Sequence, residues 1–509
     1  MKIDAAALPR TAALAERLAE LHDIACAAGL LGWDREANMP PGGQEGRIAQ
    51  MGTMSRLLHR MTTDDAVGAL IEDAATELAG RPADDPAVAL VRVTRRHYDD
   101  ARCLPDDFVR RRADVSGRAH PAWVKARAED DFGAFAPHLE AVVDLNRELA
   151  ELYGYADDPY DAVLDRFEEG ATTAEVRGLF DALQATLVPI AAAIRESGRA
   201  IDDRMLHRHY PVPDQQAYAR ELAQSVGYDL ERGHIGTAVH PFAASFGRGD
   251  CRITTRWYPD FVGASLFGTL HECGHAMYEQ GTDPAYARGP LGRGASSGVH
   301  ESQSRLMENI VGRSRGFWEA RFGGLQAAFP AALGDTDADG FYRAVNKVSG
   351  TPIRVESDEL TYNLHIVLRF ELEQALLAGD LAVRDLAGAW NDRMAALLGI
   401  VPPSNREGVL QDVHWTRPSF GYFPTYALGN LIAAQLYEAA VAADPTVATD
   451  LQAGSPAALW SWLGEHVHQH GKRFKPAELV ERATGSPLSV DAFVRYARAK
   501  FSDVYDLEL

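Results

Sequence analysis

The stretch LFGTLHECGHAMYEQG, residues 266–281, carries the pattern that decides the fold class of this chain. Its apolar residues recur at helical spacing, and further apolar side chains lead into it from residue 261. Gly281 follows the last patterned residue, and glycine suits the position just after a helix. The stretch therefore predicts a helix that ends at Gly281.

His271 and His275 stand four residues apart within this helix. Both rings then project from one face, at a spacing that fits one tetrahedral metal ion. Glu272 lies one step round the helix, where it can take a proton from an activated water without binding the metal. The alternative interpretation is an amphipathic helix with two structural histidines, because an HExxH sequence arises by chance in roughly 4 of 100 such chains.

A third metal ligand is available after a glycine-rich loop. Zinc bound by two histidines needs one more protein ligand and an open position. Glu301 follows His271 by thirty residues (301 − 271) and lies in a second helix-like segment, VHESQSRLMENIVGRS. Glu308 stands seven residues further on, two α-helical turns along the same face, where it could accept a hydrogen bond from a ligating histidine. A surface carboxylate is the alternative for Glu308.

Helical periodicity recurs along the rest of the chain. Thr172 and Glu175 have the spacing of a capping box, and Thr11 is a candidate N-cap for the first helix. Similar helical patterns occupy residues 140–153, 215–226, 360–378 and 431–443. The clearest alternating strand is CRITTRW, residues 251–257, with Ile253, Thr255 and Trp257 on one side. We therefore predict a mostly α-helical fold with a small sheet near the middle.

Composition narrows the possible partners. The 509 residues include 51 basic and 72 acidic side chains, a formal charge of −21. Binding of nucleic acid or an anionic membrane relies on cationic side chains, so we expect neither partner. No apolar leader opens the chain and we find no charge-free window that predicts a membrane span. The four cysteines are scattered, which predicts a reduced, cytoplasmic protein.

Together with HECGH, four further motifs resemble the carboxypeptidase Taq family of metallocarboxypeptidases. HESQ contains Glu301, and DCRITTR resembles the family's DxRxT motif through Asp250, Arg252 and Thr254. IRVESD resembles IRxxAD through Arg354 and Asp358, with Ser357 in place of alanine. GVLQDVHW resembles GxxQDxHW, and its matching residues are Gly408, Gln411, Asp412, His414 and Trp415. LLGWDREANMPPGGQEGR and YDAVLDRFEEG also look similar to the family, so the resemblance covers nearly the whole chain.

This resemblance implies one helical domain over residues 1–509, with a long central groove and a small sheet beside the active site. Its parts would be an N-terminal helical part to about residue 240, a metal-site part from about 241 to 430, and C-terminal helices from about 431 to 509. It also implies a homodimer that removes single residues from the free C-termini of peptides. One divalent metal ion would bind each chain; we expect zinc, with cobalt as the alternative.

The resemblance also implies roles for individual residues. His271, His275 and Glu301 would bind the metal, and Glu272 would be the general base. Arg354 would grip the terminal carboxylate of the substrate, which suits a planar guanidinium. Substrate contacts would come from Tyr426 and Gln411, with His414 lining the site; His414 and Tyr426 are our candidates to stabilise the oxyanion. Supporting or structural roles are expected for Glu308, Asp250, Arg252, Asp358 and Asp412.

Two other functions remain open at this point. An oligopeptidase or dipeptidase of the same helical class would share the HExxH sequence and a downstream glutamate, but need not recognise a terminal carboxylate. A binding or chaperone-like protein with an unused metal site is the second alternative, although the three ligands together with Glu272 argue against it. Asp250, Arg252 and Asp412 could equally form an ion-pair scaffold or contact substrate.

Overall fold

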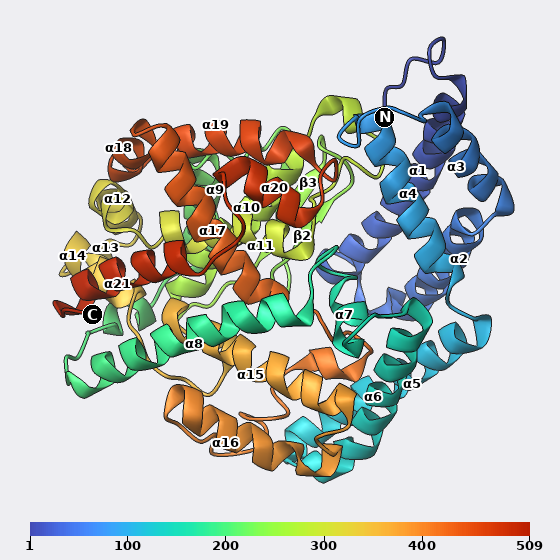
Figure 1. The fold of residues 1–509 in the computed structure, drawn as a ribbon. Coiled ribbons are helices and arrows are strands. Elements are labelled where there is room, and N and C mark those ends of the chain that lie inside the picture. Colours follow the sequence, from blue (N-terminus) through green and yellow to red (C-terminus); the bar gives the residue numbers. More distant parts are fainter. The chain divides into compact units, whose positions relative to one another are not determined.

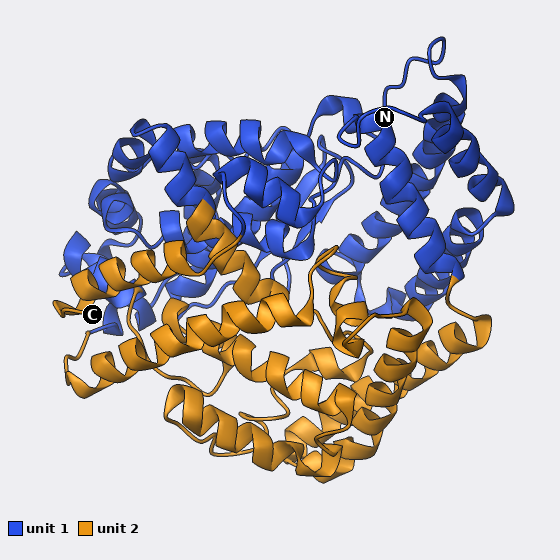
Figure 2. Ribbon diagram, in the orientation of Figure 1, with its two compact units in different colours: residues 1–102, 202–345, 436–487 blue, residues 103–201, 346–435, 488–509 orange.

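The computed structural model of the chain describes residues 1–509 and contains twenty-one α-helices and one three-stranded sheet (Figure 1). This confirms the mostly helical fold with a small sheet. The chain divides into two compact units, drawn in separate colours in Figure 2. Unit 1 comprises residues 1–102, 202–345 and 436–487, and unit 2 comprises 103–201, 346–435 and 488–509. That the chain acts as one domain stays a prediction.

Unit 1 holds the sheet and most of the helices. Its α-helices are α1 (Pro9–Ala37), α2 (Gln44–Thr62), α3 (Asp65–Glu77), α4 (Pro86–Arg102), α9 (Val212–Ser225), α10 (Val262–Gln280), α11 (Ser297–Arg305), α12 (Arg315–Ala328), α13 (Pro330–Leu333), α14 (Ala338–Val345), α18 (Thr446–Gln452), α19 (Ala457–His466) and α20 (Pro476–Thr484). A π-helix, η4 (Leu306–Val311), follows α11 directly.

Unit 2 contains helices and connecting loops but no strand. Its α-helices are α5 (Asp106–Glu129), α6 (Phe132–Tyr153), α7 (Pro159–Leu164), α8 (Thr173–Glu196), α15 (Glu359–Ala378), α16 (Leu386–Leu398) and α21 (Asp491–Tyr505). Two short 3-10 helices, η5 (Arg354–Glu356) and η7 (Val413–Thr416), carry motif residues. α17 (Pro424–Ala443) has residues in both units.

The sheet has the order β1-β3-β2, so the predicted strand is the central one. β3 (Cys251–Thr255) pairs in parallel with β1 (Gly233–Thr237) and antiparallel with β2 (Ala243–Ser245). The strand ends at Thr255, so Trp257 lies outside it. The side chain of Thr254 is fully buried and hydrogen-bonded to the backbone of Phe242. A polar side chain can be buried at little cost when it finds such partners.

The first helix begins earlier than predicted. α1 starts at Pro9, a residue favoured in the first turn of a helix, so Thr11 lies inside it and is not its N-cap. Thr11 is buried, and its N–H and hydroxyl both donate to Oε2 of Glu77 in α3, at 2.8 and 2.7 Å. α1, α3 and α4 enclose an apolar core that includes Leu14 and Leu90. The contact that explains Thr11 is therefore tertiary.

The helix predicted from the capping box is α8. Thr172 accepts the N–H of Glu175, whose carboxylate accepts the N–H of Thr172, so the capping box is confirmed. α8 is also the one helix long and apolar enough to cross a membrane, a test that core helices pass as well. Its apolar stripe, from Val176 to Ile194, is buried within unit 2, whereas the opposite face is not.

Candidate metal centre

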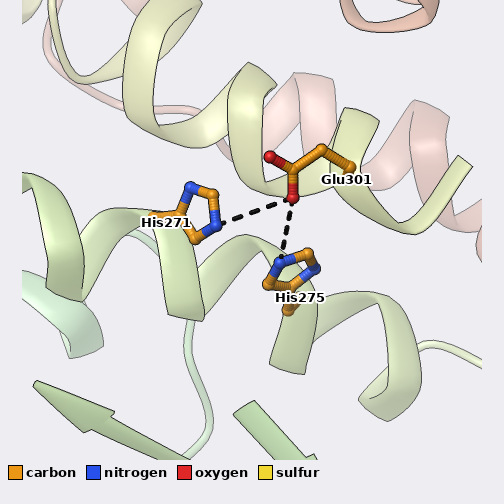
Figure 3. A group of neighbouring side chains, drawn as sticks. All are labelled: His271, His275 and Glu301. Carbon is orange, nitrogen blue, oxygen red and sulfur yellow. Dashed lines mark ion pairs between the residues drawn. The ribbon is translucent and has the colours of Figure 1, made fainter. Parts of the chain in front are cut away.

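The two histidines of the HExxH sequence lie on one face of α10, as their spacing predicts (Figure 3). The ring centroids of His271 and His275 are 4.9 Å apart. Their Nε2 atoms lie 3.7 and 3.4 Å from Oε2 of Glu301. One donor atom from each of the three residues lies within 4.8 Å of the other two. The three side chains could therefore hold a single metal ion.

α10 ends at the predicted residue, although for a different reason. Gly281 caps the helix with φ −83°, a backbone angle open to any residue. A Cβ at this position would lie only 2.7 Å from Cβ of His468. Glycine is therefore needed here for close packing and not for a left-handed backbone.

Glu301 reaches the histidines because α10 and α11 cross closely. Ser296 caps the start of α11, where its side chain accepts the N–H of Val299 at 3.0 Å. Gly274 lies between the two histidines and faces the backbone of α11. A Cβ on Gly274 would lie 2.3 Å from the carbonyl oxygen of Gln303. Only a residue without a side chain allows the two helices to approach this closely.

Glu308 contacts His271, but through a π-helix and not through two regular α-helical turns. The chain passes from α11 into the π-helix at Leu306–Val311, which contains Glu308. Oε2 of Glu308 lies 2.9 Å from Nδ1 of His271, leaving Nε2 of that ring directed at Glu301. Single π turns of this kind are often found at functional sites.

Two arginines hold the carboxylates of the site in the ionised form. Nε of Arg305 donates to Oε1 of Glu301 at 2.7 Å, and its Nη1 donates to Oε2 of Glu308 at 3.3 Å. Nη2 of Arg313 donates to Oε1 of Glu308 at 3.1 Å. Burial opposes ionisation, but the nearby Arg305 holds the pKa of both Glu301 and Glu308 well below the usual range. Ionised carboxylates are the form that binds a metal.

The two histidines differ in their affinity for protons. Burial lowers the pKa of His275 to about 4, with His300 and His271 acting in the same direction. Burial also disfavours a charged His271, but Glu301 and Glu308 raise its pKa to about 9. A metal ion binds the neutral ring, so binding at His271 would displace a proton.

Glu272 is the remaining ionisable group of the HExxH sequence. Its side chain is buried, and Oε2 has no hydrogen-bond partner. Burial raises the pKa of Glu272 to about 7, and the negative charges of Glu301 and Glu308 act in the same direction. A carboxylate with a pKa near neutrality suits a group that must both accept and return a proton.

Asp250 and Arg252, at the start of β3, form an ion pair with each other. Nε and Nη2 of Arg252 donate to the two carboxylate oxygens of Asp250 at 2.7 and 2.8 Å. The guanidinium also lies over the ring of Trp33, 4.8 Å from its centroid. These contacts favour the scaffold interpretation of the two residues.

Arg354 and Asp412 belong to a buried charge cluster in unit 2. Nε and Nη2 of Arg354 donate to Oδ1 of Asp412 at 3.1 and 2.8 Å, and Nη1 donates to the hydroxyl of Tyr362 at 3.0 Å. Nε of Arg369, which is fully buried, donates to Oδ2 of Asp412 at 2.6 Å. Two arginines thus share one carboxylate, so the three groups carry a net positive charge.

The guanidinium of Arg354 has hydrogen-bonding capacity beyond this cluster. Its three bonds use three of the five N–H groups, which leaves one on each terminal nitrogen. The ring of Tyr426 lies near the guanidinium, with its centroid 5.1 Å away. Two neighbouring N–H groups beside a net positive charge match what a carboxylate requires.

The remaining motif residues of unit 2 contact backbone groups and one another. Gln411 accepts the N–H of Arg354 at 2.8 Å and donates to three backbone carbonyls. Asp358 caps the start of α15. Nε2 of His414 lies 3.4 Å from the hydroxyl of Tyr426, so these two candidates are neighbours. Burial lowers the pKa of His414 to about 4, with Arg354 acting in the same direction.

Several residues that support the site were not predicted. Arg305 stands four residues after Glu301, a spacing at which ion pairs form on a helix, and this signal could have been used. His300, which contacts His275, and Arg369, which contacts Asp412, carry no comparable local signal. Their roles depend on contacts between separate segments of the chain.

Comparisons with known proteins agree with the resemblance. The family model described as carboxypeptidase Taq (M32) metallopeptidase matches residues 13–501. Thermostable carboxypeptidase 1 of Thermus thermophilus is 42% identical over 492 residues, which cover 95% of this chain and 96% of the relative. Carboxypeptidase 1 of Bacillus subtilis is 37% identical, covering 94% and 95% respectively.

Solved structures show the same fold. The M32 carboxypeptidase from Deinococcus radiodurans R1 has a TM-score of 0.94 and 41% identity, covering 98% of this chain and 100% of that one. A Pyrococcus furiosus carboxypeptidase has a TM-score of 0.93 and 35% identity, covering 97% and 99%. The chain therefore belongs to the carboxypeptidase Taq (M32) family of metallopeptidases and is a metal-dependent carboxypeptidase.

Proposed function

We propose that this carboxypeptidase uses zinc held by His271, His275 and Glu301 and releases single amino acids from free peptide C-termini. The observation that carries the proposal is the position of Glu272. Its buried, unpartnered carboxylate oxygen belongs to the residue that directly follows the first histidine of the cluster. An unpartnered buried carboxylate is costly, and a polar reactant beside it would satisfy it.

The residues fit a divalent metal ion. Two imidazoles and one carboxylate form the donor set of several catalytic zinc sites, and the three donor atoms already converge. Two neutral rings and one carboxylate would leave zinc with a net positive charge. Cobalt remains the alternative, because nitrogen and oxygen donors of this kind accept both metals.

The metal would act as a Lewis acid, which polarises the scissile carbonyl and lowers the pKa of the attacking water. Glu272 accepts a proton as the water oxygen attacks the carbonyl carbon. It then delivers that proton to the amine nitrogen as the peptide bond breaks. Its pKa of about 7 suits both steps at neutral pH.

Arg354 is proposed to bind the terminal carboxylate of the substrate through its two remaining N–H groups. The net positive charge of Arg354, Arg369 and Asp412 supports this role. Tyr426 and His414 are proposed to donate to the oxyanion. Substrate contact by Gln411 stays a prediction, since its amide is engaged with backbone groups of Pro352 and Arg354 and of its own loop.

An oligopeptidase or dipeptidase activity is the alternative. Such enzymes need not bind a terminal carboxylate, so the two remaining N–H groups of Arg354 do not support this activity. A homodimer, a cytoplasmic location and the absence of nucleic-acid and membrane partners remain predictions. They rest on the family resemblance, the cysteine usage and the charge of the chain.

The substitution Glu272→Gln tests the proposed general base. We expect the variant to bind one equivalent of zinc and to lose 10²- to 10⁴-fold in kcat, roughly the contribution of a positioned acid or base. Glu45→Gln, at an exposed position on α2, is the matched control and should keep full activity. Unchanged turnover in Glu272→Gln, with zinc bound, would refute this mechanism.

A further inference from the structure

The two histidines of the metal centre have different partners behind them. Nδ1 of His271 faces the carboxylate of Glu308 directly. Nδ1 of His275 lies 2.7 Å from Nδ1 of another imidazole, that of His300 in α11. A carboxylate or a carbonyl oxygen usually occupies this position behind a metal-binding histidine. The contact between His275 and His300 therefore requires its own explanation.

The contact continues to a buried carboxylate. Nε2 of His300 lies 3.2 Å from Oε1 of Glu279, which is in the last turn of α10. The same oxygen accepts the N–H of Gly294 at 3.1 Å, and Nη1 of Arg293 lies 3.6 Å from Oε2. Glu279 is 6% exposed. Gly294 and Arg293 thus offset the negative charge of Glu279, and its Oε1 faces His300.

Hydrogen-bonding rules then fix the position of each proton. If Nε2 of His275 binds a metal, the proton of that neutral ring must be on Nδ1. It can only donate to Nδ1 of His300, which must be the unprotonated nitrogen of its ring. His300 therefore carries its proton on Nε2 and donates it to Glu279. In this series, from His275 through His300 to Glu279, each ring N–H that donates has an acceptor.

We propose that His300 is a positioning residue, which accepts the Nδ1 proton of His275 and links this ligand to the charge of Glu279. It would hold Nε2 of His275 toward the metal and make the ring a better donor. This inference rests on the proposed binding of the metal by His271, His275 and Glu301. The metal centre would thus have one ligand supported directly by a carboxylate and one supported through an imidazole.

Packing of the His300 ring is the alternative explanation. The ring lies 5.3 Å from that of Tyr278, measured between centroids, and a Cβ on Gly294 would lie 2.7 Å from its Cδ2. If packing alone mattered, phenylalanine would replace His300 well and the smaller asparagine would not. If the acceptor matters, the order is reversed, because Oδ1 of asparagine can take the place of Nδ1.

The experiment measures the affinity of the metal-free, full-length protein for Zn²⁺, by competition with a chromophoric chelator. We expect His300→Phe to weaken binding by about 10- to 100-fold, the usual effect of losing such a partner. His300→Asn should recover most of this loss, and Glu279→Gln should give an intermediate loss. The Co²⁺ absorption spectrum should change in His300→Phe and stay close to wild type in His300→Asn. Unfolding midpoints of the metal-free variants measure any general loss of stability.

Three outcomes would overturn the inference. Wild-type affinity in His300→Phe, or weaker binding in His300→Asn than in His300→Phe, would show that the ring only packs. A Glu279→Gln variant indistinguishable from wild type would remove the carboxylate from the series. The variant His275→Ala tests the proposed metal site separately. If it binds Zn²⁺ as tightly as the wild type, the proposed function itself is wrong.

Discussion

Gly274 of α10 lies directly against the backbone of Gln303 in α11, so closely that a Cβ on the glycine would be 2.3 Å from the carbonyl oxygen of Gln303. Gly274 stands between the two histidines, and Gln303 follows Glu301 by two residues. The distance between the two backbones therefore sets the distance between the imidazoles and the carboxylate. The glycine in HECGH is as important to the geometry of the site as its donor residues.

The substitution Gly274→Ala should separate the two helices. We expect a loss of about 1–3 kcal/mol in the free energy of unfolding, the usual effect of overpacking, together with weaker Zn²⁺ binding. The control is Gly323→Ala on α12, where a Cβ meets nothing within 4 Å. Alanine should be neutral there or stabilise by up to about 1 kcal/mol. Equal metal affinity in Gly274→Ala and Gly323→Ala would contradict this role of the crossing.

Arg354 should determine the preference for a free C-terminus. Arg354→Lys keeps a positive charge beside Asp412 but cannot offer two parallel N–H groups. We expect KM for a free-carboxylate peptide to rise about tenfold or more, the effect of one lost charged hydrogen bond. Arg354→Ala should raise KM as well, although it also removes a partner of Asp412.

The comparison with amidated peptides makes this prediction specific. Arg384→Lys, at an exposed position in unit 2, is the matched control. Initial rates on paired peptides, one free and one amidated at the C-terminus, give the preference directly. If Arg354→Lys prefers the free over the amidated peptide as strongly as Arg384→Lys does, another residue binds the terminal carboxylate.

Glu373 should make the stability of the chain depend on pH. Burial raises its pKa to about 7, even though Trp415, Tyr160 and the N–H of Gly421 all donate to it. Because this pKa is above that of the unfolded chain, the contribution to stability is complete below about pH 4.3. It is then lost as the pH rises through 7, by an amount on the order of 3 kcal/mol.

Glu373→Gln isolates this effect. The amide does not ionise, so the stability of the variant lacks this pH dependence. Between pH 5 and pH 8 the unfolding midpoint of the wild type should therefore fall relative to that of the variant. The pH dependence is the quantity to compare, since the amide also presents an N–H to one of the donors around Glu373. A difference independent of pH would mean that the carboxyl has an ordinary pKa.

Much of the fold could be predicted because the signals are local. The capping box of Thr172 and the apolar stripe behind it lie within one helix, and both are present. The error at Thr11 has a tertiary cause: α1 begins at Pro9, and Thr11 donates instead to Glu77 of α3. The burial of Thr254 likewise depends on a contact with another segment, its hydrogen bond to the backbone of Phe242.

In the candidate site too, some residues are placed by local spacing and others by tertiary contacts. The positions of His271 and His275 follow from helical spacing alone. Their distance from Glu301 depends on the crossing at Gly274, and the direction of Glu308 depends on a π-helix that no spacing rule predicts. His300 was missed because its partner lies on another helix.

The most direct test of the proposed function is mass spectrometry of the products from one N-terminally blocked peptide, offered with a free and with an amidated C-terminus. We expect the free peptide to lose single C-terminal residues in succession, the amidated peptide to resist, and a chelator to abolish the reaction until Zn²⁺ is restored. Internal cleavage of both peptides at equal rates would contradict release from the C-terminus and favour the oligopeptidase alternative.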